Sequence, residues 1–231
     1  LIMVQKLSKL LIDQTFDRPE DGAAWLASKT TLSFAKAAIE MALWDAYGKQ
    51  TQQSLATLLG GQIKQVTVSK AIGMQVDWEM TQQLVIDAIA KGYQRIKIKI
   101  NQTTDLQMVA ALVKDFPNQM FSLDANAAWN SDRLADLQLL NQAGLAMIEQ
   151  PYAATAWLKH QQTQEKLSQL KLSLDESLNN LTDVKRAIAH HTTAALTLKQ
   201  GKLGGITQTK TAIQLTNQSQ MTPWIGGMLG T

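Results

Sequence analysis

The sequence predicts an α/β fold in which strands and helices alternate to build a modified TIM-type (β/α) barrel. Three observations predict it. Short β-like runs are each followed by a helical stretch, polar residues recur near the strand ends at a nearly constant spacing, and those polar residues share one face of each strand. Parallel strands need helical crossovers of this length, so we expect a parallel sheet, either doubly wound or closed into a barrel.

Residues 1–62 are expected to form a separate helical segment before the strands. Their main helix is predicted over Ser33–Lys49, with one apolar stripe made by Phe34, Ala37, Ala38, Met41 and Ala42. No Gly/Ser-rich or Pro-rich linker follows this segment. We expect the domain boundary between residues 62 and 63.

Residues 63–231 carry a series of seven predicted strands. Gly92 and Gly144 precede the second and the fourth strand, where a helix would end on a left-handed residue. The series predicts barrel strands one to seven and no eighth, so we expect the chain to be a fragment with open strand edges that is prone to aggregate on its own. The seven runs are Val66–Gly73, Arg95–Ile100, Phe121–Asn126, Leu145–Pro151, Lys171–Ser177, Ala194–Gln200 and Thr222–Gly227.

Charged residues near the strand ends repeat with the length of one βα unit. Lone residues of this kind have ordinary explanations, because an Asp at a strand end is usually a helix cap and a Lys-x-Lys strand is usually a solvated edge. Independent caps and edges have no reason to share both period and face, so the set as a whole indicates a functional site. Its members, separated by 25, 25, 26 and 24 positions, are Lys99, Asp124, Glu149, Asp175 and Lys199.

The faces on which these residues lie favour a closed barrel over a doubly wound sheet. Side chains of a strand alternate between two faces, so Lys97 lies with Lys99, and Asp124 with Asn126, opposite the apolar residues. Between two layers of helices such charges would be buried at a cost of several kcal/mol each. In a barrel they face the mouth at the carboxyl ends of the strands, where the active sites of that fold lie.

Three of the charged residues are carboxylates from consecutive strands and can converge on one point. Asp124, Glu149 and Asp175 would repel one another there unless a cation joined them, and hard oxygen ligands suit Mg²⁺ or Mn²⁺. Zinc is less favoured, because the chain has no cysteine and its three histidines fall outside the strand ends. Asn126 is a candidate for a supporting contact at this site, or for a turn residue at the strand end.

Composition excludes several classes of protein. With 45% hydrophobic and 18% charged residues the chain is not disordered, and without cysteine it has no disulfide scaffold, thiolate nucleophile or iron–sulfur cluster. A reducing, cytoplasmic location fits. The formal net charge is only +3 and the sequence has no run of four or more Lys or Arg residues, so we expect no nucleic-acid partner. The apolar stretch Leu1–Ile12 is interrupted by lysines and too short to span a bilayer, so we expect no membrane partner.

The motifs that carry these residues resemble the enolase superfamily. The resemblance is strongest to its o-succinylbenzoate synthase and N-acylamino acid racemase branch, within the muconate-lactonizing-enzyme subgroup. The helix Ala35–Asp45 and the following Leu58-Leu59-Gly60-Gly61 also look like that family's. The motifs are Lys97-Ile98-Lys99, Leu123-Asp124-Ala125-Asn126, Ile148-Glu149-Gln150-Pro151, Leu174-Asp175-Glu176-Ser177, Leu198-Lys199 followed by Gly204-Gly205, and Gly226-Gly227-Met228.

The resemblance implies a barrel with an α+β capping domain, of which residues 1–62 would be a helical remainder. It also implies removal of a proton α to a carboxylate, with Mg²⁺ or Mn²⁺ held by the three carboxylates and a small carboxylate as substrate. Two positions depart from the family pattern: Gly230 stands where an acidic residue is common, and Gln200 replaces a proline. The implied catalytic residues are Lys97, Lys99 and Lys199, and the implied contacts around the metal or the substrate are Asn126, Gly226, Gly227 and Met228.

Three readings of the activity remain open at this point. The leading one is o-succinylbenzoate synthase, a dehydration in menaquinone biosynthesis, in which Lys99 would take the proton and return it to the leaving hydroxyl while Lys199 stays cationic. The second is racemisation of N-succinyl- or N-acylamino acids, in which Lys99 and Lys199 would work on opposite faces of the α-carbon. The third is a non-catalytic remnant of a barrel. A homo-oligomer is compatible with each of them.

Overall fold

The computed structural model describes residues 1–62, 65–130, 132–167 and 169–228. The chain divides into two compact units. One unit comprises Leu1–Lys64, Leu178–Ile188 and Thr197–Thr231, and the other comprises Gln65–Ser177 and Ala189–Leu196. The domain boundary predicted between residues 62 and 63 stays a prediction, because these units are defined by compactness alone.

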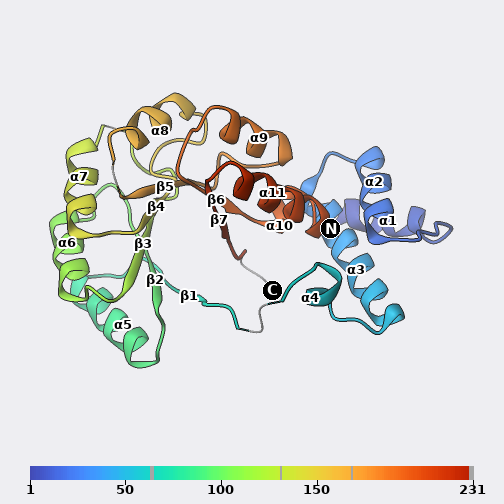
Figure 1. Ribbon diagram of the computed structural model, residues 1–231, viewed down its shortest axis with the longest axis horizontal. Coiled ribbons are helices and arrows are strands. Elements are labelled where there is room, and N and C mark those ends of the chain that lie inside the picture. Colours follow the sequence, from blue (N-terminus) through green and yellow to red (C-terminus); the bar gives the residue numbers. More distant parts are fainter. Residues whose placement is uncertain (63–64, 131, 168, 229–231) are drawn as a thin grey trace. The chain divides into compact units, whose positions relative to one another are not determined.

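The second unit alternates strands and helices throughout (Figure 1). Its helices α5 to α8 all lie on one side of the strands. The elements are β1 (Ser69–Ile72), α5 (Trp78–Ala90), β2 (Arg95–Lys99), α6 (Leu106–Asp115), β3 (Met120–Asp124), α7 (Leu134–Ala143), β4 (Met147–Glu149), α8 (Trp157–Gln164), β5 (Lys171–Leu174) and the first half of β6 (Ala195–Leu198).

The first unit contains the helices that precede the strands and the elements around and after β6. The elements are α1 (Ile2–Leu11), α2 (Pro19–Lys29), α3 (Ser33–Thr51), α4 (Leu55–Leu58), most of α9 (Leu181–Ala189), α10 (Gln200–Leu203), α11 (Ile206–Gln218) and β7 (Thr222–Ile225). Among the helices of the described residues, none combines the length and the apolar composition that crossing a membrane requires.

The strands form one seven-stranded sheet in chain order, β1 to β7. Each pair from β1–β2 to β5–β6 is parallel. This order and the helices between successive strands are those of a (β/α) barrel, so the predicted fold class is confirmed. The register aligns Lys99 with Asp124, and Asp124 with Glu149, which places three of the predicted site residues side by side.

All seven predicted strands exist, but most are shorter than the β-like runs in the sequence. The first begins at Ser69, and the preceding Val66 and Val68 are exposed. The third and fourth end at Asp124 and Glu149, and the backbone turns into positive φ shortly after each, at Asn126 (42°) and Gln150 (40°).

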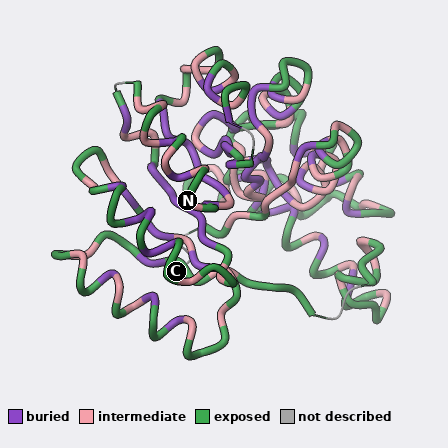
Figure 2. Tube along the Cα trace, turned by 60° about the vertical axis from the view of Figure 1, so that its left-hand side comes forward, coloured by how far each residue is buried: buried purple, intermediate pink, exposed green. Residues whose placement is uncertain are grey.

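Local sequence explains where several helices of this unit begin and end. Asp77 and Asp105 cap α5 and α6, and their carboxylates accept hydrogen bonds from the backbone N–H groups of Met80 and Gln107. Gly144 ends α7 with a φ of 90°, as the sequence predicts. Figure 2 shows helices whose buried and exposed residues alternate along their length, as expected for helices that cover a sheet on one face.

The predicted helix over Ser33–Lys49 is confirmed as α3, but its predicted apolar stripe is wrong. Phe34 is 58% exposed and Met41 is 38% exposed. Of the predicted stripe only Ala37 is buried, and it shares the buried face with Glu40 and Trp44 at helical spacing. A charged residue therefore lies in the middle of the buried face. The spacing of apolar residues in the sequence cannot reveal such a face.

Glu40 is buried because the amino end of α11 binds its carboxylate, within the first unit. The carboxylate accepts hydrogen bonds from the backbone N–H groups of Ile206 (2.7 Å) and Thr207 (2.9 Å) and from the indole N–H of Trp44 (2.8 Å). A negative charge at a helix amino terminus satisfies free N–H groups and is favoured by the helix dipole. Gly205 precedes the helix at a φ of 128°, and a Cβ there would collide with the Glu40 carboxylate.

Candidate active site

The carboxyl ends of β2, β3 and β4 bring four of the predicted site residues to one edge of the sheet. The parallel register sets Lys99 beside Asp124 and Asp124 beside Glu149. Lys97 lies on the same face as Lys99, two residues earlier on β2, while Ile96 and Ile98 on the other face are buried in the core. The polar face that the sequence predicts is therefore present on β2.

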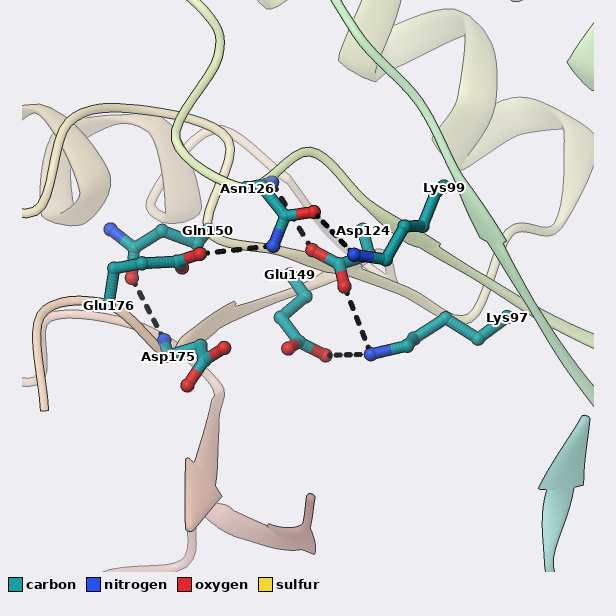
Figure 3. Close-up of polar contacts among 8 residues, drawn as sticks. All are labelled: Lys97, Lys99, Asp124, Asn126, Glu149, Gln150, Asp175 and Glu176. Carbon is teal, nitrogen blue, oxygen red and sulfur yellow. Dashed lines mark hydrogen bonds and ion pairs between the residues drawn. The ribbon is translucent and has the colours of Figure 1, made fainter. Parts of the chain in front are cut away.

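The ammonium of Lys97 lies between two buried carboxylates (Figure 3). Its Nζ is 3.0 Å from Oδ2 of Asp124 and 3.2 Å from Oε2 of Glu149. Burial lowers the pKa of Lys97, but the Glu149 and Asp124 carboxylates outweigh that effect and leave the pKa raised above its ordinary value. Lys97 is therefore a permanent cation at neutral pH.

Lys99 is held by a different partner. Its Nζ donates a hydrogen bond to Oδ1 of Asn126 (3.1 Å), and Nδ2 of Asn126 donates to Oε1 of Glu176 (3.0 Å), as Figure 3 shows. A carboxylate only accepts hydrogen bonds, so Glu176 fixes which end of the amide faces Lys99. The backbone N–H of Asn126 also donates to Oδ1 of Asp124 (3.2 Å), so the turn after β3 is tied to the carboxylate that ends it.

Asp175 lies just beyond the end of β5. The last aligned pair of β4 and β5 is Glu149 with Ser173, so Asp175 follows two residues further on the same face. Its side chain is buried, and its backbone N–H donates to Oε1 of Gln150 (2.8 Å). The structure thus brings all three predicted carboxylates to the ends of neighbouring strands.

The three side chains provide the type of ligand atom that a hard divalent cation prefers. Three carboxylates at adjacent strand ends offer the oxygen ligands that Mg²⁺ and Mn²⁺ prefer. Lys97 shows that this place binds positive charge, since its ammonium is shared by two of the carboxylates. Within residues 1–62, 65–130, 132–167 and 169–228, no three His, Asp or Glu side chains are clustered closely enough to hold a metal ion. Asp124, Glu149 and Asp175 are the residues that would hold one, after a rearrangement of their side chains.

The other predicted site residues belong to the first unit. Lys199 follows β6 and precedes α10, and its carbonyl accepts a hydrogen bond from the N–H of Leu203 (3.0 Å). Gly226 packs against it, because a Cβ on Gly226 would come within 2.7 Å of Cε of Lys199. A Cβ on Gly227 would meet open space, and Met228 is 49% exposed. Lys199 therefore lies against the first glycine of the Gly-Gly motif, whereas Gly230 lies outside the described residues.

Comparison with known families identifies both parts of the chain. Residues 80–231 match the family described as enolase C-terminal domain-like, and residues 2–60 match the N-terminal domain of mandelate racemase and muconate lactonizing enzyme. The chain belongs to the enolase superfamily. The resemblance drawn from its motifs is thereby confirmed.

Two curated relatives of this chain in the enolase superfamily have names that describe different activities. An o-succinylbenzoate synthase of Enterococcus faecalis is 34% identical over 227 residues, which cover 98% of this chain and 62% of that protein. An N-succinylamino acid racemase of Thermus thermophilus is 34% identical over 195 residues, which cover 84% of this chain and 53% of that protein. The chain thus spans about three fifths of the length of relatives such as the first.

A solved structure confirms the fold of this enolase superfamily chain. A member of the superfamily from Listeria innocua superposes with a TM-score of 0.91 at 32% identity, over 98% of this chain and 61% of that one. The superposed part is almost the whole of this chain.

Several residues that shape the site are missing from the predicted set. Gln150, Ser177 and His160 are buried together behind Glu149 and Asp175, and Glu176 holds the amide of Asn126. Gln150, Glu176 and Ser177 stand inside the quoted motifs, so their places in the sequence are visible. Their roles cannot be read from the sequence, because each role depends on a turn that begins after the alternating pattern of the strand has ended.

The histidine behind the site gives a testable pH dependence. His160 is fully buried, its Nδ1 donates to the carbonyl of Ala156 (2.8 Å), and its ring packs edge-on against Tyr152. Burial lowers its pKa to about 4, against the smaller raising effect of the bond to Ala156 and with a further lowering by Lys159. The neutral form is therefore the one that the folded protein holds.

The folded protein is expected to lose stability in mild acid through His160. The unfolded chain, with a His pKa near 6.5, binds more protons than the folded one between about pH 6.5 and 4, so this contribution falls as the pH falls. The free energy of unfolding should drop by roughly 2 kcal/mol from pH 7.5 to pH 5 on this account. Urea denaturation of the protein and of His160→Phe at both pH values measures it, with the exposed His190→Phe as the control. An equal acid loss in all three proteins would contradict the assignment.

Proposed function

We propose that this protein removes a proton from the carbon next to a carboxylate, and that its reaction is the dehydration catalysed by o-succinylbenzoate synthases. The observation that carries the proposal is the edge formed by β2, β3 and β4. A buried pair of carboxylates shares the Lys97 ammonium there, with a second lysine two residues along the same strand. The Enterococcus faecalis relative, named o-succinylbenzoate synthase, supports the choice of dehydration.

The difficulty of the reaction is the negative charge that develops on the substrate carboxylate as the proton leaves. Asp124, Glu149 and Asp175 would hold a divalent cation, whose positive charge would stabilise that carboxylate when it is bound. Lys97 keeps its own charge, since its two carboxylate partners raise its pKa, and so adds a fixed cation on the same face. Both cations would stabilise the transition state more than the bound substrate, because the carboxylate carries more negative charge in the transition state.

Lys99 is the proposed base. Its Nζ takes the proton from the α-carbon, and the electron pair of the broken C–H bond moves into the substrate carboxylate. Asn126 then accepts a hydrogen bond from the newly formed ammonium, through the contact of 3.1 Å that is already present. In the dehydration, Lys99 returns this proton to the leaving hydroxyl group, which departs as water, so the base is regenerated in one turnover.

Lys199 is proposed as a second cation that stabilises the intermediate. Its packing against Gly226 restricts the side chain on one flank. Such a reaction would place the protein in menaquinone biosynthesis. The lack of cysteine supports a reducing, cytoplasmic location.

A second activity, racemisation of N-succinylamino acids, is favoured by one specific observation. The Thermus thermophilus relative of that name is also 34% identical to this chain, over 195 residues rather than the 227 of the o-succinylbenzoate synthase. Both reactions begin with the same proton abstraction by Lys99. They differ in whether Lys199 delivers a proton to the opposite face of the α-carbon.

The proposal predicts proton chemistry that depends on a divalent cation. The purified protein with Mg²⁺ or Mn²⁺ should dehydrate the substrate of o-succinylbenzoate synthases, as followed by absorbance, and should exchange the α-proton of N-succinylamino acids in D₂O, as followed by NMR. Removal of the metal with EDTA should abolish both, and added Mg²⁺ should restore them. Activity that survives exhaustive chelation contradicts the metal site, and the absence of both reactions with metal present favours a non-catalytic barrel.

A further inference from the structure

One buried amide connects the strand ends that carry Glu149 and Asp175. Gln150 is fully buried immediately after β4, and its φ of 40° turns the chain away from the strand direction. The backbone still pairs on both sides, since its N–H donates to the carbonyl of Ser173 (2.8 Å) and its carbonyl accepts from the N–H of Ala127 (2.8 Å). The side chain is thus placed between β4 and β5 at the point where their ladder ends.

All the hydrogen-bonding capacity of the Gln150 amide is used within this unit. Oε1 accepts from the backbone N–H groups of Asp175 (2.8 Å) and Ser177 (3.2 Å), and Nε2 donates to the carbonyl of Tyr152 (3.0 Å) and to Oγ of Ser177 (2.9 Å). The Ser177 hydroxyl has one proton, which the shorter contact assigns to the carbonyl of Ala154 (2.8 Å), so its Oγ accepts from the amide.

The Gln150 amide forms a hydrogen bond between the two chain segments beyond the last aligned pair of β4 and β5. The last aligned pair of β4 and β5 is Glu149 with Ser173, and no strand pairing reaches the N–H of Asp175. Gln150 supplies that N–H with an acceptor from its side chain and fastens it to the turn that follows Glu149. Together with the backbone bond to Ser173, the Gln150 side chain therefore links the position of Asp175 to that of Glu149 beyond the last aligned pair.

We propose that Gln150 is a positioning residue that holds the Glu149 and Asp175 carboxylates ready for a shared divalent cation. The inference rests on the proposed function, because it assigns Gln150 a role toward the metal of that same site. Residues that orient metal ligands without touching the metal commonly contribute 10–100-fold to affinity. A side chain that only supported the fold would change stability and leave the affinity of the folded protein unchanged.

A second glutamine of the same unit provides a matched control. Gln164 in α8 also ties strands together through backbone groups: its Oε1 accepts from the N–H groups of Leu172 (2.7 Å) and Ala194 (3.1 Å), and its Nε2 donates to the carbonyl of Leu170 (3.1 Å). These contacts lie at the amino ends of β5 and β6, whereas Gln150 acts at the carboxyl ends of β4 and β5. Both substitutions remove a similar set of bonds, but only one lies beside the carboxylates.

The test is the affinity for Mn²⁺, measured by titration calorimetry and by the electron spin resonance signal of free Mn²⁺. Measurements use the purified protein at a temperature where circular dichroism shows every variant folded. Gln150→Met and Gln164→Met should both lower the denaturation midpoint. Only Gln150→Met should weaken Mn²⁺ binding, by about tenfold or more, whereas Gln164→Met should change it less than about threefold.

The outcomes separate the two proposals. A wild-type protein that binds no Mn²⁺ contradicts the proposed function. A wild-type protein that binds Mn²⁺, with equal loss of affinity in both methionine variants or none in Gln150→Met, overturns only the positioning role. Should Gln150→Met fail to fold, Ser177→Ala decides, since it removes one of the four bonds of the amide: at least a twofold loss of Mn²⁺ affinity supports the role, and unchanged affinity overturns it.

Discussion

Lys99→Ala is expected to abolish dehydration and to stop proton exchange on one face of the α-carbon. The methyl side chain cannot accept a proton, and in the dehydration the same base serves both proton transfers. Loss of a general base lowers rates by about 100- to 10,000-fold, so we expect a fall of at least about 1,000-fold in kcat. The measurement is the dehydration assay together with NMR of N-succinylamino acids in D₂O, with the exposed Lys114→Ala as the control.

Lys199→Ala distinguishes the two candidate reactions. If each lysine serves one face, this variant should lose racemisation but still exchange the α-proton of one enantiomer, and Lys99→Ala should exchange only the other. If the protein is a dehydratase in which Lys199 acts as a cation, Lys199→Arg should keep part of the activity that Lys199→Ala loses. Full dehydration by Lys99→Ala would show that Lys99 is not the base, and the motif Lys97-Ile98-Lys99 would then be misassigned.

The strands and their polar face could be predicted from the sequence because both follow simple periods. Alternation along β2 separates Lys97 and Lys99 from Ile96 and Ile98, and the structure buries the isoleucines. The spacing of about 25 residues reflects the length of one βα unit, and a parallel register then places Asp124 beside Glu149. Periodicity and register are properties of the regular backbone, so they can be read without side-chain detail.

The parts that could not be predicted begin where the regular backbone ends. Gln150 and Asn126 have positive φ, so the alternation of strand faces no longer says where their side chains point. Their partners, such as Glu176, lie up to 50 residues away and are joined by amide and carboxylate contacts that leave no period in the sequence. For the same reason the motif Glu149-Gln150-Pro151 does not reveal that its middle residue fastens Asp175.

The buried face of α3 could not be predicted from the sequence for a related reason. Apolar spacing selects Phe34 and Met41, but both are exposed, and the buried face is centred on Glu40. A carboxylate can occupy a buried position because the amino end of α11, more than 160 residues later, supplies its hydrogen bonds. Such pairing depends on the tertiary structure, which the hydrophobic pattern of one helix does not contain.

Glu149→Gln is expected to remove most of the divalent-cation affinity with little loss of folded protein. Glu149 is fully buried, and the amide has the same size and keeps an oxygen that can accept from Lys97, so the packing should survive. The substitution removes one of the three negative charges that would hold the cation. Because the cation carries twice the charge of the Lys97 ammonium, it loses more attraction than Lys97 does when this charge is removed.

We therefore expect Mn²⁺ affinity to fall by at least about 100-fold, more than the 10–100-fold typical of residues that only orient the ligands. Calorimetry and the denaturation midpoint, measured on the same samples, separate lost binding from lost folding. Glu165→Gln, an exposed residue of the same unit, is the control for a change of net charge. Unchanged affinity in Glu149→Gln would mean that the cation lies elsewhere, and that the carboxylates at the ends of β3 and β4 serve only to hold Lys97.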